Sequence, residues 1–150
     1  MKQSKKSMPK KKKSETVKNW QVPSDLSEVQ KISAQVIAFF KPLGLSDAYR
    51  FDIRLCLEEA LINAMKYGNG LKRETPVQLQ AGFDEKKVWL RLEDRGQGFD
   101  VSKVGDCTHG ENLLKGGGRG IYLIHELMDE VKFNARGNVI LMIKSTQGPA

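Results

Sequence analysis

The sequence lacks the features that mark membrane proteins, secreted proteins and metal-stapled domains. No apolar run approaches the roughly 20 residues of a membrane-spanning helix, and no apolar stretch follows the lysine-rich N-terminus as it would in a signal peptide. Cys56 and Cys107 are the only cysteines, and neither belongs to a C-x-x-C pair. We therefore expect neither a disulfide framework nor a zinc site, and two isolated thiols fit a reducing cytoplasm.

The excess of basic charge is confined to the N-terminal tail. The chain carries a net charge of +7, but residues 1–18 contain eight lysines and a single acid. The rest of the chain therefore holds 17 basic and 17 acidic residues. We expect residues 1–15 to be a disordered basic tail and residues 16–147 to form one domain. A solvated leader is the favoured interpretation of the tail, and weak attraction to nucleic acid or anionic lipid is the alternative.

Apolar spacing after the tail predicts both helices and strands. The four residues 25–28 (DLSE) resemble a capping box at the start of the first helix. In chain order, the expected elements are a strand at 17–22, helices at 26–41 and 46–67, paired strands at 77–81 and 88–92, a helix at 121–128, and paired strands at 131–133 and 139–143.

The second predicted helix carries an unusual polar stripe. At about 100° per residue, Asp52, Glu59, Asn63 and Lys66 fall on one line along this helix. Apolar residues flank the line on both sides, whereas an ordinary surface helix has one apolar and one polar face. The stripe therefore predicts polar groups that line a partly buried cavity.

Helix geometry also separates two adjacent acids. Glu58 lies about 140° around the helix from Asn63, and Glu59 lies only about 40° from it. Glu58 follows Arg54 by four residues, a spacing that predicts a solvent-side ion pair. Glu59 is therefore the acid that shares a site with Asn63, although an isolated E-x-x-x-N would more simply be solvated.

Two glycine motifs follow later in the chain. Asp94, Gly96 and Gly98 form D-x-G-x-G directly after a predicted strand, where glycine permits close backbone approach to a ligand. Residues 116–120 (GGGRG) run into a predicted helix, and backbone N–H groups at such a helix start bind anions. No Gly-Lys-Ser/Thr ending is present, so this is not a Walker loop. Alone, these motifs are also compatible with a plain turn and a flexible linker.

In this order, the three motifs resemble the nucleotide-binding boxes of the ATPases shared by gyrase and histidine kinases, the Bergerat fold. The resemblance is greatest to the bacterial anti-sigma factor serine kinases and covers roughly residues 16–145. Residues 59–64 (EALINA) match the E-A-x-x-N-A of that family. Residues 118–120 (GRG), with 123–124 (LI) and 127–129 (LMD), match its G-x-G…L-I…L-M-D pattern.

The resemblance implies an α/β sandwich, with one mixed, mostly antiparallel sheet and helices on one face. It also implies that ATP binds with Mg²⁺. Glu59 would be the general base, Asn63 would hold Mg²⁺ against the phosphates, and Asp94 would accept from the adenine amino group. Residues 99–117 would form a mobile lid. Further nucleotide contacts would come from Lys66, Gly96, Gly98, Lys115, Gly118, Arg119 and Gly120.

The sequence departs from the family pattern at three places. Tyr67 stands where many relatives have histidine, and residues 136–138 (RGN) replace the usual Gly-Thr before the last strand. Gly116 occupies a position where an arginine near the phosphates is common. Lys115 and Arg119 are the candidates to take the place of that arginine.

The resemblance predicts a cytoplasmic serine/threonine protein kinase that phosphorylates a small antagonist protein, the anti-anti-sigma protein of a partner-switching circuit. A sigma factor would be a further partner and the kinase a homodimer, with no membrane partner and nucleic acid bound only weakly by the tail. The alternative is a nucleotide-gated binding module that sequesters a partner without kinase activity. A detached histidine-kinase catalytic domain is disfavoured, because no dimerisation helices with a phosphorylatable histidine precede the domain.

Overall fold

A computed structural model describes residues 15–96 and 118–146 of the chain. The expected lid, Gly98, Lys115 and all but the last residue of the expected tail lie outside the described residues. None of the described helices is both long and apolar enough to cross a membrane. The main elements are β2 (Thr16–Val22), α2 (Val29–Phe39), α3 (Asp47–Asn63), β3 (Val77–Phe83), β4 (Lys87–Glu93), α5 (Gly118–Leu127), β5 (Glu130–Phe133) and β6 (Val139–Ser145).

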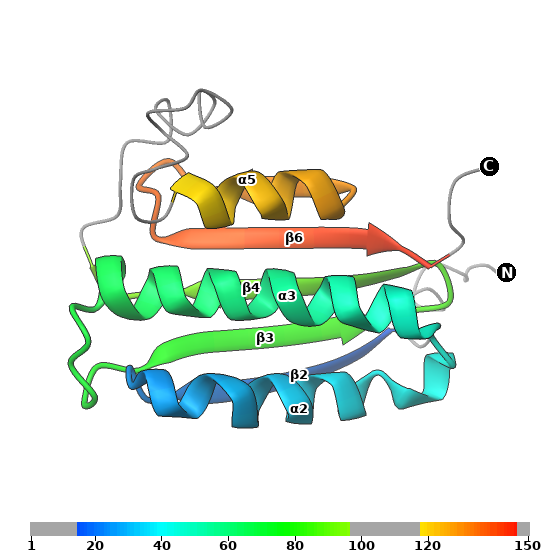
Figure 1. The fold of residues 1–150 in the computed structure, drawn as a ribbon, viewed down its shortest axis with the longest axis horizontal. Helices are drawn as coiled ribbons and strands as arrows, with labels where there is room; N and C mark the ends of the chain where they lie inside the picture. Colours follow the sequence, from blue (N-terminus) through cyan, green and yellow to red (C-terminus); the bar gives the residue numbers. More distant parts are fainter. Residues whose placement is uncertain (1–14, 97–117, 147–150) are drawn as a thin grey trace, which may run out of the picture.

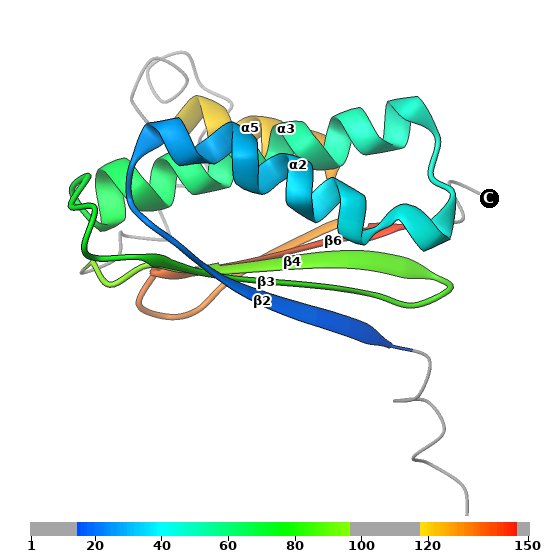
Figure 2. The ribbon, with the colours of Figure 1, turned by 90° about the horizontal axis from the view of Figure 1, so that it is seen from below.

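The described residues form a two-layer sandwich of one sheet and three α-helices, and the sandwich was expected. The sheet has the strand order β2-β3-β4-β6-β5, and the three helices all cover the same face (Figures 1 and 2). Helix α3 lies between α2 and α5 (Figure 1). This arrangement gives α3 two helical neighbours and places its inner side on the sheet.

Every strand pairing in the described chain is antiparallel. The expected sheet was mostly antiparallel but mixed, and in this part of the chain it is purely antiparallel. Two helices, α2 and α3, connect β2 to β3, and the chain reverses direction three times along this path, which leaves β3 antiparallel to β2 (Figure 1). The connection from β4 through α5 to β5 is of the kind that makes parallel strands, but β6 lies between these two strands and pairs with both. The topology therefore keeps the parallel strands apart.

The core lies between the sheet and the helices. Alternate residues of the central strands point towards the helices, which explains the period of two in the sequence. Side chains from α3 fill the middle of this layer, and each fully buried aliphatic side chain contributes roughly 1.5–3 kcal/mol. The fully buried residues include Ile53, Leu57, Leu61, Leu79, Leu90, Leu92, Ile124 and Met142.

The ends of the helices follow local hydrogen bonding. Ser46 caps α3, because its side chain accepts from the Tyr49 N–H at 3.1 Å. The capping box expected before α2 does not form. Asp25 accepts from the N–H of Ser27 at 2.9 Å, two residues on, and a short 3₁₀ turn, η1 (Leu26–Glu28), precedes the α-helix. The tighter 3₁₀ turn changes which N–H groups face the capping side chain.

Helix α3 does not stop at Asn63 but widens into a π-helical turn, η3 (Ala64–Gly68). The helical stretch therefore reaches the predicted end near Tyr67, with a wider last turn. The Asn69 N–H closes this turn by donating to the Ala64 carbonyl at 2.8 Å. Single π turns are rare and occur frequently at functional sites. Here the π turn directly follows a predicted site residue.

Candidate functional site

The structure brings Glu59 and Asn63 of α3 against the first turn of α5. Gly120 is buried at this contact. A Cβ atom added to Gly120 would lie 2.6 Å from Glu59 Oε1 and 3.4 Å from Asn63 Nδ2. Only glycine lets the two helices approach this closely without moving the carboxylate. Two of the three predicted motifs, far apart in sequence, therefore meet at one point.

The Asn63 side chain has an unused polar group at this point. Its Nδ2 atom is buried and has no hydrogen-bond partner among residues 15–96 and 118–146. A buried polar group without a partner costs about 1–3 kcal/mol, so such groups in folded proteins call for an explanation. A side-chain amide also presents an oxygen, the ligand atom that Mg²⁺ prefers. The residue thus fits a ligand-binding role, including the metal role predicted for it.

The two adjacent acids face different helices. Glu58 accepts from Arg54 Nε at 2.9 Å, which confirms the predicted pair. It also accepts from the Ser33 hydroxyl of α2 at 2.7 Å, and its side chain is only 21% exposed. The prediction of a solvent-side pair was wrong in this respect, because α2 packs over that flank of α3. The Glu58 carboxylate is hydrogen-bonded to α2, whereas Glu59 faces α5.

The ends of the polar stripe differ from its middle. Asp52 Oδ2 lies 3.9 Å from the Lys144 ammonium of β6, so an ion pair closes one end. Lys66 lies on η3 at the other end and is exposed. Its ammonium lies over the ring of the neighbouring Tyr67, 5.4 Å from the ring centroid. The partly buried part of the stripe that meets α5 therefore consists of Glu59 and Asn63.

The D-x-G turn after β4 packs directly on the π turn after α3. A Cβ atom on Gly68 would overlap the Asp94 carboxylate, and one on Gly96 would overlap the Gly68 carbonyl. The Asp94 carboxylate accepts from the Gly96 N–H at 2.8 Å, which fixes its orientation within the turn. Asp94 is therefore placed beside the same end of α3 that carries Asn63. The apolar spacing predicted only that a helix ends at residue 67 and gave Gly68 no role.

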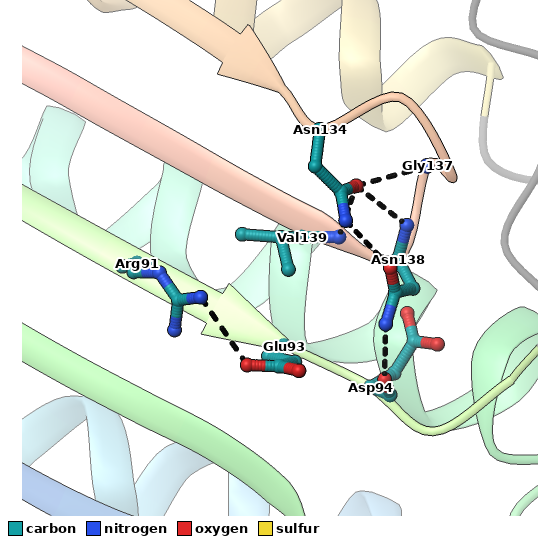
Figure 3. A network of polar contacts seen from close by, with 7 residues as sticks. All are labelled: Arg91, Glu93, Asp94, Asn134, Gly137, Asn138 and Val139. Atoms are coloured by element: carbon teal, nitrogen blue, oxygen red, sulfur yellow. Dashed lines mark hydrogen bonds and ion pairs between the residues drawn. The ribbon is translucent and has the colours of Figure 1, made fainter.

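Asn138 of the β5–β6 turn holds the Asp94 backbone, and Asn134 holds Asn138 (Figure 3). Asn138 Nδ2 donates to the Asp94 carbonyl at 3.0 Å, and the Asp94 N–H donates to the Asn138 carbonyl at 2.9 Å. Asn134 donates to Asn138 Oδ1 at 2.8 Å, and its own oxygen accepts from the N–H groups of Gly137, Asn138 and Val139. Asn138 belongs to the segment in which this sequence departs from the family pattern, and the structure gives it a contact with Asp94.

The remaining predicted residues are placed as follows. Gly118 begins α5, and Arg119 is exposed in its first turn. Arg136, on the β5–β6 turn, donates to the Gly96 carbonyl at 2.9 Å and so reaches the D-x-G turn. Gly98 and Lys115 lie outside the described residues.

Burial raises the pKa of Asp94 above the ordinary value of an aspartate. The hydrogen bond from the Gly96 N–H and the positive charge of Arg136 lower this pKa, and the negative charge of Glu93 raises it further. The raised pKa means that ionising the carboxylate is less favourable in the folded chain than in the unfolded chain.

We expect Asp94→Asn to increase the free energy of unfolding at pH 7. When folding raises the pKa of an acid, the folded state loses stability as the pH rises from the unfolded pKa, about 3.9, through the folded pKa. Above the folded pKa the loss of stability is constant. The free energy of unfolding that Asp94→Asn gains over the parent should therefore shrink as the pH falls through this window. Urea unfolding at pH 7 and pH 4 tests this, with the exposed Glu85→Gln as the control for losing one negative charge. A loss of stability at pH 7 would refute the assignment.

Comparison with known proteins gives the following similarities. The family model of the histidine kinase-like ATPase domain matches residues 22–144. Serine-protein kinase RsbW of Oceanobacillus iheyensis is 31% identical over 107 residues, which are 67% of this chain and 68% of that protein. Serine-protein kinase RsbW of Staphylococcus aureus (strain bovine RF122) is 30% identical over 132 residues, 82% of each chain.

A solved structure also shares the fold. It contains the RsbU and RsbW domains of Rv1364c from Mycobacterium tuberculosis. The two structures align with a TM-score of 0.58 at 12% sequence identity. The alignment covers 87% of this chain and 32% of that one. At this identity the likeness concerns the fold alone.

Proposed function

This chain belongs to the histidine kinase-like ATPase domain family, which its sequence matches over residues 22–144, and from that membership we propose that it is an ATP-dependent serine/threonine protein kinase. Its 30% identity with RsbW of Staphylococcus aureus supports a kinase of the anti-sigma factor type. The observation that carries the proposal is the approach of Gly120 to Glu59 and Asn63. This approach brings together a carboxylate that can act as a base, an amide that can hold a metal ion, and a helix start that can position phosphates, and phosphoryl transfer requires these three functions.

In the proposed site, ATP extends from Asp94 towards the start of α5. Asp94 accepts from the adenine amino group, and the N–H groups of the first turn of α5 bind phosphate oxygens. Asn63 would hold Mg²⁺, which when bound offsets negative charge on the phosphates. The other residues proposed to contact the nucleotide are Lys66, Gly96, Gly98, Lys115, Gly118, Arg119 and Gly120.

Glu59 is proposed to act on the attacking hydroxyl. It accepts the proton of a serine or threonine hydroxyl while that oxygen bonds to the γ-phosphorus, the bond from the γ-phosphorus to the bridging oxygen breaks, and ADP leaves. Glu58 is excluded from this role, because Arg54 and Ser33 already occupy its carboxylate.

We place the ATPase domain at residues 16–147, in the cytoplasm, as part of a homodimer. The proposed substrate is a small antagonist protein of a partner-switching circuit, with a sigma factor as the second partner. Both partners come from the similarity to the anti-sigma factor kinases, and the basic tail is proposed to be dispensable for ATP binding.

One incubation tests the proposed function. The purified chain is mixed with γ-labelled ATP, magnesium and candidate antagonist proteins from the same genome. We expect label on a serine or threonine of one antagonist, and no label with a Glu59→Gln chain. If ATP changes the binding of an antagonist but label is never transferred, the chain is instead a nucleotide-gated binding module.

Gly120→Ala is expected to lower the rate of transfer by roughly 10-fold or more. The added methyl group would lie 2.6 Å from Glu59 Oε1 and must displace that carboxylate, while the backbone of α5 can stay in place. A displacement of about 1 Å in a catalytic group costs up to roughly 10²-fold in rate. Because the effect acts through Glu59, adding Gly120→Ala to a Glu59→Gln chain should cause little further loss. If Gly120→Ala lowered the transfer rate of the Glu59→Gln chain by as large a factor as it lowers the rate of the parent, this mechanism would be contradicted.

A further inference from the structure

A buried asparagine, Asn69, lies between the two ends of the proposed ATP site. It is only 6% exposed and directly follows the π turn η3. Its N–H donates to the carbonyl of Ala64, the residue after Asn63, at 2.8 Å. Its side-chain oxygen accepts from the N–H of Arg95, the residue after Asp94, at 2.7 Å. One residue thus bonds the metal end of the site to the adenine end.

The Asn69 amide is also fully engaged on its nitrogen side. Nδ2 donates to the Ser24 hydroxyl at 3.1 Å and to the Thr75 carbonyl at 2.9 Å. Ser24 is itself buried and donates to the same Thr75 carbonyl at 2.6 Å. A side chain with its amide groups satisfied and with little solvent exposure has few other positions open to it. Asn69 can therefore act as a rigid support, and its amide is not free to bind ATP itself.

The support acts on the orientation of the Asp94 carboxylate. Two successive N–H groups set this turn, because Arg95 donates to Asn69 and Gly96 donates to Asp94 itself. Gly68, the neighbour of Asn69, lies so close to the carboxylate that no side chain fits between them. Asn138 bonds the Asp94 backbone and Arg136 bonds the Gly96 carbonyl, but neither bonds the peptide N–H of Arg95. Loss of the bond from Arg95 would therefore loosen the turn between these two supports and let the carboxylate rotate away from the base.

We infer that Asn69 is a positioning residue for Asp94 and that it sets the preference of the site for a purine with a 6-amino group. The inference rests on the proposed function, because it requires Asp94 to accept from that amino group. Asn69 acts through the Arg95 N–H and does not touch the base.

Two nucleotides separate this role from a merely structural one. ATP carries the 6-amino group, and purine riboside triphosphate lacks only that group. A hydrogen bond to a charged acceptor should make the parent prefer ATP by roughly 10- to 100-fold. We expect Asn69→Ala to bring the two dissociation constants within about 3-fold of each other. Asn69→Ser, which keeps a polar group in the buried site but cannot span from Ser24 to Arg95, should do the same if the alanine variant fails to fold.

Ser24→Ala is the matched control. It removes the bonds that the Ser24 hydroxyl makes with Asn69 Nδ2 and with the Thr75 carbonyl. The bond from Asn69 Nδ2 to Thr75 and the bond from the Arg95 N–H to Asn69 remain, so the preference for ATP should stay within about 2-fold of the parent value. Titration calorimetry of each folded variant with both nucleotides gives the ratios. An Asn69 variant that weakens both nucleotides equally, or keeps the parent ratio, overturns the inference and leaves the proposed kinase intact. A parent that binds both nucleotides equally overturns base recognition by Asp94 and this inference with it, whereas label transfer tests the kinase separately.

Discussion

Replacing Glu59 by glutamine is expected to lower phosphoryl transfer by roughly 10²–10⁴-fold while ATP remains bound. Glutamine keeps the size of the side chain beside Gly120 but cannot accept the hydroxyl proton. The measurement is the rate of label transfer from ATP to the antagonist protein, made alongside the affinity for Mg·ATP. A Glu59→Gln chain that transfers label at the parent rate would exclude Glu59 as the base.

Glu58→Gln is the matched control, because it makes the same chemical change one residue away. The glutamine oxygen can still accept from Ser33 and Arg54, so only the charge of the pair with Arg54 is lost. Such partly exposed pairs contribute up to about 1 kcal/mol, and the transfer rate should stay near that of the parent. If Glu58→Gln were the inactive variant, Glu58 and not Glu59 would be the base, and the catalytic roles of the two acids would have to be exchanged.

Asn63→Ala is expected to weaken the binding of Mg·ATP by roughly 10- to 100-fold. The change removes the proposed oxygen ligand of the metal. It should not destabilise the fold, because Asn63 Nδ2 is buried without a partner among the described residues, and its removal abolishes an unsatisfied group. Calorimetry with magnesium and with chelator gives the affinities, and urea unfolding gives the stability.

The exposed Asn19→Ala on β2 controls for the loss of an amide. The parent should bind ATP more tightly with magnesium than with chelator, and Asn63→Ala should lose most of that difference. An equal dependence on magnesium in the parent and in Asn63→Ala would remove Asn63 from the metal site.

Regular helix geometry explains what the sequence could predict about the site. Because α3 is an ordinary α-helix from Asp47 to Asn63, the positions of Glu58 and Glu59 in the sequence are enough to place them on different sides of the helix. The alternation in β3 and β4 likewise predicted their hairpin, and the apolar spacing predicted a helix at the position of α5. Period alone does not say which helix packs on which flank, so the bond from Ser33 to Glu58 was not foreseen.

The residues that hold Asp94 in place could not be predicted from such patterns, for a different reason. Asn69 bonds to Arg95 and Ser24, which are 26 and 45 residues away in the chain. Asn138 reaches Asp94 across 44 residues. All of these contacts start from turns, where no repeating geometry links sequence position to direction. The residue type does indicate a turn, since asparagine beside glycine is frequent in turns. It does not indicate which residue the asparagine side chain will bond.

The central claim is that this chain has one ATP site between Asn63 and Asp94. Titration of the full chain with Mg·ATP in a calorimeter tests it most directly. The account predicts saturable binding of one nucleotide per chain. The absence of saturable binding to the folded chain would contradict it.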